Sequence, residues 1–145
     1  MFKTILLAYN GTREGKSALL ACAEIALFAK SDMHLLAVAN MPSSMFITEG
    51  YLSEELLDAE KKHGQQVLDE GAAQLKQMGI NVIPHLKIGE PVEEICRLAA
   101  ELKANLIIIG HQQKAPLTSR WWRGSVGRML LDHAPCSIYI ARTRK

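Results

Sequence analysis

Several features that would announce a specific chemistry are missing from this chain of 145 residues. Its three cysteines, Cys22, Cys96 and Cys136, form no CxxC pair, and its five histidines lack metal-ligand spacing, so no zinc site is expected. No apolar run approaches the ~20 residues that cross a bilayer, which argues against a membrane role. The odd cysteine count and the lack of a signal-peptide pattern favour a reducing, cytoplasmic location.

Catalytic and nucleic-acid signatures are missing as well. The net charge of +2 is too small to indicate a nucleic-acid partner. The chain has no nucleophile elbow, no Walker lysine pattern and no Rossmann GxGxxG, and His111 has no carboxylate nearby in the sequence to orient it. These absences argue against an efficient enzyme and leave, at most, a slow ATPase.

What the chain does contain is a regular alternation of strand-like and helix-like patterns. Short apolar runs predict strands at Phe2–Ala8, His34–Ala39, Asn81–Leu86, Leu106–Ile109 and Ser137–Ala141. Apolar residues at helical spacing predict helices at Ser17–Ala29, Ser53–Met78, Pro91–Leu102 and Ser125–His133. Cys22 and Cys96 lie on the apolar stripes of two of these helices and are expected to be buried thiols.

This alternation predicts an α/β fold with an open parallel five-stranded sheet and helices on both faces, in one domain spanning residues 1–145. The first and fourth strands are the most apolar and belong in the centre, whereas Pro84 suits an edge. The order 3-2-1-4-5 satisfies both conditions. Ligands of such sheets bind where the chain reverses, outside the carboxyl ends of the strands. Here the loops at that reversal are Tyr9–Arg13 and Gly110–Arg123.

The second of these loops has the composition of a phosphate site. It leaves the strand at Gly110, carries basic residues and ends at Gly124-Ser125-Val126, where a helix is predicted to begin. Free N–H groups and the positive end of a helix dipole attract anions, and Arg123 is a candidate charge partner. The simpler alternatives are that Ser125 caps the helix and that Gly110 makes a turn.

The chain resembles the universal stress protein family along its whole length. The resemblance rests on Ile5–Thr12, on Leu35–Val38, on Gly124–Val126 and on His133–Ile138, the last being the most specific. It implies the 3-2-1-4-5 sheet of the adenine nucleotide alpha hydrolase-like fold and homodimers paired through the last strand. For some members it also implies binding of an adenosine nucleotide.

The implied ligand is ATP or AMP, with Mg²⁺ accompanying ATP. The residues expected to hold it are Ala8, Asn10, Val38, Gly110, His111, Arg123, Gly124, Ser125 and Val126. Ala8 and Val38 would flank the base, unless they serve only as core residues. Asn10 would bond to the base or ribose, unless it only makes a turn with Gly11. Binding would then order the loop Gly110–Arg123.

Three departures from the family's nucleotide pattern favour a second hypothesis. Gln113 replaces a glycine, the loop is one residue longer, and Asn10 stands where binding members usually have aspartate. The alternative is a nucleotide-free dimeric interaction protein. It would act through its dimer surface, through Trp121-Trp122 or through the apolar segment Met45–Leu52. In both hypotheses Ser137–Ala141 is an exposed edge that invites pairing with a second copy.

Overall fold

The structure is a computed structural model that describes residues 2–40, 54–111 and 126–142. Its strands are β1 (Thr4–Ala8), β2 (Asp32–Asn40), β3 (Val82–Gly89), β4 (Leu106–His111) and β5 (Ser137–Arg142). They form one parallel sheet in the order β3-β2-β1-β4-β5. The predicted strand order is therefore confirmed, with Pro84 on an edge strand and the apolar β1 and β4 inside.

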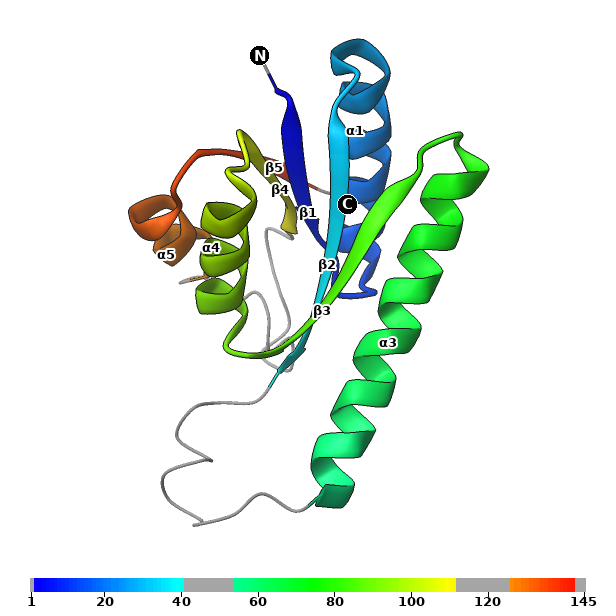
Figure 1. Cartoon of the computed structure of the whole chain (residues 1–145), viewed down its shortest axis with the longest axis vertical. Helices are drawn as coiled ribbons and strands as arrows, with labels where there is room; N and C mark the ends of the chain where they lie inside the picture. Colours follow the sequence, from blue (N-terminus) through cyan, green and yellow to red (C-terminus); the bar gives the residue numbers. More distant parts are fainter. Residues whose placement is uncertain (1, 41–53, 112–125, 143–145) are drawn as a thin grey trace.

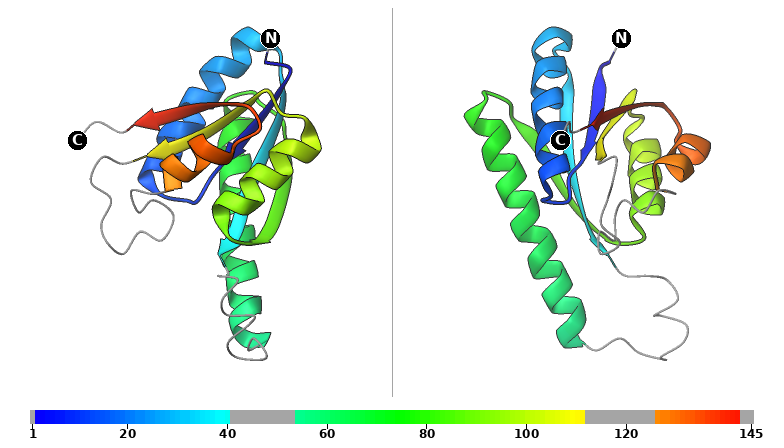
Figure 2. Two further views of the ribbon diagram at one scale, coloured as in Figure 1. Left: turned by 90° about the vertical axis from the view of Figure 1, so that its left-hand side faces the viewer. Right: turned by 180° about the vertical axis from the view of Figure 1, so that it is seen from behind.

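Helices cover both faces of this sheet (Figure 1; Figure 2). On one face, α1 (Arg13–Ala29) packs against β4 and β5, and α3 (Glu54–Gln77) packs against β2 and β3. On the other face lie α4 (Pro91–Leu102) and α5 (Val126–His133), which contact each other. The first turns of α3 extend past the carboxyl ends of the strands, and the first buried residue of this helix is Gly64. Of the helices that the structure describes, none has the length and apolar character needed to span a bilayer.

The core has two parts because successive side chains of a strand point to opposite faces. Ile5 and Leu7 of β1, together with Tyr9 directly after it, face α1 and α3, whereas Leu6 and Ala8 face the α4 side. All five are at most 1% exposed, so the sheet is buried on both sides at its centre. Such burial explains why the sequence of β1 is a continuous apolar run instead of an alternating one.

Several boundaries differ from those predicted. Helix α1 begins at Arg13 instead of Ser17, because the Thr12 side chain caps it by accepting a hydrogen bond from the Gly15 N–H at 3.2 Å. Strand β4 continues to His111, so Gly110 is not an exit from the strand. It is buried and pairs with Ala141 of β5. Cys22 is fully buried as expected, but Cys96 is only half-buried at the border of the core on the α4 side.

Candidate functional site

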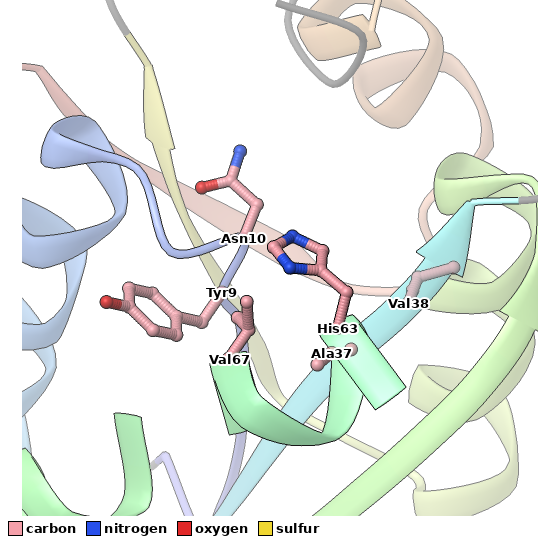
Figure 3. A pocket seen from close by; sticks show the side chains of 7 residues that line it. Tyr9, Asn10, Ala37, Val38, His63 and Val67 are labelled. Carbon is pink, nitrogen blue, oxygen red and sulfur yellow. The ribbon is translucent and has the colours of Figure 1, made fainter. Parts of the chain in front are cut away.

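A small pocket opens at the carboxyl ends of β1 and β2, beside α3 (Figure 3). Its volume is about 30 Å³. A water molecule needs about 10–15 Å³ on the same measure, so the pocket has room for two or three. An edge of a flat ring can enter such a space, but a whole purine cannot. The residues that line it are Tyr9, Asn10, Ala37, Val38, His63, Gly64 and Val67.

Asn10 supplies the most polar part of the pocket wall. The residue follows β1 directly, and Gly11 turns the chain with a φ of +79° that L side chains rarely adopt. This turn brings Thr12 back to the Asn10 side chain. The oxygen Oδ1 of Asn10 accepts hydrogen bonds from the Thr12 backbone N–H at 3.1 Å and from the Thr12 hydroxyl at 2.5 Å. Its nitrogen Nδ2 is buried and has no hydrogen-bond partner among the residues that the structure describes.

An unpaired buried donor of this kind is unusual in a folded protein. Its desolvation costs about 1–3 kcal/mol when no partner is supplied, and native proteins pair nearly all such groups. The prediction that Asn10 and Gly11 make a turn is confirmed by the geometry. The same geometry leaves half of the amide available to a ligand, so the turn and the binding role are compatible.

Tyr9 holds this end of β1 between two helices. A Cβ added at Gly15 of α1 would lie 2.8 Å from Cδ1 of the ring, and one added at Gly71 of α3 would lie 2.8 Å from Cδ2. Both helices can therefore reach the ring only through glycine. The Tyr9 hydroxyl donates to Oε1 of Glu70 at 3.3 Å, and Lys16 lies 3.8 Å from the same oxygen. Burial, reinforced by the Glu70 carboxylate, raises the pKa of Tyr9 to about 12, so its hydroxyl stays protonated at neutral pH.

Helix α3 contributes three pocket residues that the sequence did not assign to the site, His63, Gly64 and Val67. His63 is exposed, and in Figure 3 its ring lies between Asn10 and Val38. Gly64 is buried, and a Cβ there would lie 2.9 Å from the Leu86 side chain and 3.7 Å from Ala39. The signal for this contact is the pair of glycines in α3, at Gly64 and Gly71, on the stripe that faces the sheet.

Of the two residues predicted to flank the base, one lines the pocket and the other lies in the core. Val38 is 6% exposed and lines the pocket. Ala8 is 1% exposed, packs in the core on the α4 side and is not among the pocket residues, as its alternative role predicted. The pocket is also displaced from the expected reversal point between β1 and β4. It lies one strand away, between β1, β2 and α3, because the turn at Gly11 and the glycine of α3 leave space there.

Most of the predicted phosphate-binding residues lie outside the residues that the structure describes. Arg123, Gly124 and Ser125 fall outside the described residues, as do Gln113, Trp121, Trp122 and the segment Met45–Leu52. His111 is placed as the last residue of β4, and Val126 as the first residue of α5. Within the described ranges, no group of three or more His, Cys, Asp or Glu side chains could hold a metal ion.

A parallel five-stranded sheet in this order, covered by helices on both faces, places the protein in the doubly wound α/β class. The chain belongs to the universal stress protein family, because the model of that family matches residues 1–142. A universal stress protein of Thermus aquaticus is 30% identical over 146 residues, which cover 98% of this chain and 100% of the relative.

Solved structures show the same likeness. A universal stress family protein from Burkholderia pseudomallei is 30% identical and superposes with a TM-score of 0.74, covering 96% of this chain and 95% of its own. One from Arabidopsis thaliana with AMP bound is 18% identical, with a TM-score of 0.69, covering 98% and 92%. Further structures of this fold are complexes with cAMP and, from Archaeoglobus fulgidus, with dAMP. At these lower identities the likeness establishes the fold.

Proposed function

We propose that this universal stress protein binds an adenine nucleotide, ATP or AMP, as a regulatory ligand at the carboxyl ends of its central strands. The observation that carries the proposal is the pocket with an apolar wall at Val38 and an unpaired donor at Asn10. The adenine nucleotides bound by other proteins of this fold support it. The phosphates would meet Gly110, Gly124, Ser125 and Val126, with Arg123 as charge partner and with Mg²⁺ when ATP is bound.

Calorimetric titration of the purified protein with AMP and with ATP tests this proposal. We expect binding in the micromolar range or tighter, and loss of the phosphate contribution in Gly124→Val. Ala100→Val is the matched control, because Ala100 is exposed on α4, away from the pocket residues. Absence of heat at millimolar nucleotide in the wild-type protein would contradict the proposal and leave the nucleotide-free interaction protein as the better account.

We propose in addition that the protein is a cytoplasmic homodimer joined through β5. Among the strands that the structure describes, β5 pairs only with β4, and Tyr139 on it is 44% exposed. Met129 and Leu131 of the preceding α5 are also exposed, at 45% and 65%. Unpaired strand edges and exposed apolar side chains favour association. The three free cysteines suit a reducing compartment.

Light scattering coupled to size-exclusion chromatography tests the dimer. We expect a dimer that Tyr139→Lys dissociates. Leu27→Lys serves as the control, because Leu27 is 73% exposed but lies on α1. A wild-type monomer at all concentrations would contradict pairing through β5.

A further inference from the structure

Asn10 and Gly11 form the only Asn-Gly dipeptide of the chain. The amide carbon Cγ of an asparagine and the backbone nitrogen of the next residue are joined through Cβ, Cα and C, so a bond between them closes a five-membered ring. Glycine has no Cβ to shield that nitrogen or to restrict the rotation that brings it to Cγ. The other asparagines precede the larger residues Met41, Val82 and Leu106. The sequence therefore makes Asn10 the asparagine most open to attack by its own backbone.

The fold leaves this dipeptide outside its regular elements. Asn10 and Gly11 lie between the end of β1 at Ala8 and the start of α1 at Arg13, and both are half-buried. Gly11 has a φ of +79°, which L side chains rarely adopt. Among the described residues, the backbone hydrogen bonds of turns and caps include none from the Gly11 N–H. Attack by this nitrogen therefore breaks no bond of the sheet or of the helix.

Thr12 places two donors on the carbonyl that would be attacked. The oxygen Oδ1 of Asn10 accepts from the Thr12 backbone N–H at 3.1 Å and from the Thr12 hydroxyl at 2.5 Å. Donors aimed at a carbonyl oxygen stabilise the negative charge that develops there when a nucleophile adds, as in an oxyanion hole. The amide nitrogen Nδ2 has no hydrogen-bond partner in the described part of the chain. The atom that takes up charge is thus supported, while the atom that must leave has no hydrogen bond to lose.

We propose that Asn10 is a site of spontaneous deamidation in the folded protein, with Gly11 supplying the attacking nitrogen and Thr12 the donors that stabilise the oxyanion. The Gly11 nitrogen bonds to Cγ of Asn10, and its proton passes through water to Nδ2. The bond between Cγ and Nδ2 breaks, which releases ammonia and leaves a cyclic imide. One water molecule then opens the ring. Cleavage between the nitrogen and Cγ gives aspartate, whereas cleavage between the nitrogen and the backbone carbonyl carbon gives isoaspartate.

Either product changes the pocket at the carboxyl ends of β1 and β2. A carboxyl group of this kind is ionised at neutral pH, so the net charge of the chain falls by one from +2. Asn10 lines the pocket beside the apolar side chains of Val38 and Val67, so the new charge arises in its wall. Isoaspartate also lengthens the main chain by one carbon at the turn that leads into α1. The pocket would therefore change irreversibly with the age of the molecule, without a cofactor or a modifying enzyme.

Peptide mapping by mass spectrometry tests the inference on purified wild-type protein kept at neutral pH and physiological temperature. Asn105 is the matched internal control, because its side chain also accepts from a backbone N–H, that of Thr4 at 3.0 Å, but Leu106 follows it. Asn81 is exposed and serves as a second control. We expect Asn10 to be converted at least tenfold faster than either. A rate at Asn10 no greater than that at Asn105 would overturn the inference.

The products report the route. The cyclic imide yields isoaspartate together with aspartate, whereas direct hydrolysis of the amide yields aspartate alone, and that result would overturn the role of Gly11. In isoelectric focusing, aged wild type should gain an acidic band that migrates with freshly prepared Asn10→Asp. Aged Asn10→Ala should gain no such band.

The role of Thr12 has its own test. Thr12→Val removes the hydroxyl donor and should slow the conversion of Asn10 several-fold, whereas Ser17→Val in α1 should leave it unchanged. Thermal unfolding checks that both variants fold. Faster conversion in Thr12→Val would show that Thr12 protects the amide and would overturn its part in the reaction. None of these measurements uses a nucleotide, so this inference and the proposed function stand or fall separately.

Discussion

The two ends of the sheet treat their polar groups differently. At the amino ends, the Asn105 side chain accepts from the Thr4 N–H at 3.0 Å, and the Ser31 hydroxyl donates to the Phe2 carbonyl. At the carboxyl ends, Asn10 keeps a buried donor without a partner among the described residues. The amino ends thus stabilise the fold, while the carboxyl ends keep an unsatisfied group, as expected where a ligand binds.

A pair of histidines on the adjacent strands β2 and β3 also contrasts with Asn10, because these two side chains contact each other. His34 of β2 and His85 of β3 lie on the α4 side of the sheet, with Nδ1 of His34 2.9 Å from Nε2 of His85. Their rings stack with centroids 5.1 Å apart. One nitrogen of each ring is therefore paired with the other ring, whereas the Asn10 nitrogen has no partner among the described residues.

The largest effect is expected from a substitution that disturbs the packing around Tyr9 at the carboxyl ends of the strands. In Gly71→Ala, the new methyl group would lie 2.8 Å from the buried, immobile Tyr9 ring. Overpacking costs about 1–3 kcal/mol, and the gain of about 1 kcal/mol in helix propensity offsets only part of that. We expect a net loss of up to ~2 kcal/mol in the free energy of unfolding, measured with urea.

Gly64→Ala on the same helix is the matched control. The new methyl group would meet the tip of the Leu86 side chain, which can move, so the loss should be smaller. If Gly71→Ala were as stable as wild type, Tyr9 would not be fixed between the two helices.

Thr12→Val should have the next largest effect. It removes the cap of α1 and one of the two bonds that orient Asn10. We expect a loss of about 1 kcal/mol in the free energy of unfolding, together with weaker AMP binding as the amide gains freedom. Ser17→Val, a similar change farther along α1, provides the comparison. Equal loss of AMP affinity in both variants would argue against a specific role of Thr12.

Tyr9→Phe tests the polar end of the same ring. The bond to Glu70 is long, at 3.3 Å, and the Glu70 side chain is 46% exposed, so we expect only about 0.5 kcal/mol at neutral pH. Thermal unfolding of wild type and variant measures the difference. A loss of several kcal/mol would mean that the hydroxyl does more than bond to Glu70.

The histidine pair should have the smallest effect on the free energy of unfolding at neutral pH, and a larger effect as the pH falls. Burial lowers the pKa of His34, which Asp32 partly opposes. Burial, then His34 and Lys87, lower the pKa of His85, which Glu101 partly opposes. Above the unfolded value of 6.5, both states are neutral and the pair has no pH-dependent effect. Below it the unfolded chain binds protons that the folded chain resists, so stability falls until the pH passes below the folded pKa values.

Urea unfolding of wild type and His85→Gln between pH 7.5 and 5 measures this effect. We expect the stability of wild type to decline more steeply than that of the variant. His133→Gln replaces an exposed histidine and should follow wild type. A decline in His85→Gln as steep as in wild type would show that the pair does not resist protonation.

The sequence was most informative where local pattern and position suffice. The apolar runs of β1 and β4, and Pro84 on an edge, predicted the strand order that the structure has. Boundaries were less certain, because Thr12 as the cap of α1 and Gly110 inside β4 depend on contacts that an apolar pattern does not carry. In the site, Val38 was predicted and lines the pocket, whereas His63 was not among the predicted site residues.

The sequence by itself therefore determined the fold class and the end of the sheet at which we propose that a ligand binds, because hydrophobic periodicity and crossover handedness are properties of the chain. Only the tertiary structure decided that Gly15 and Gly71 enclose Tyr9, that His63 reaches the pocket, and that the Asn10 nitrogen is buried without a partner in the described part of the chain. Two of these arrangements join residues more than fifty positions apart. The third depends on the turn at Gly11, which folds Thr12 back onto Asn10.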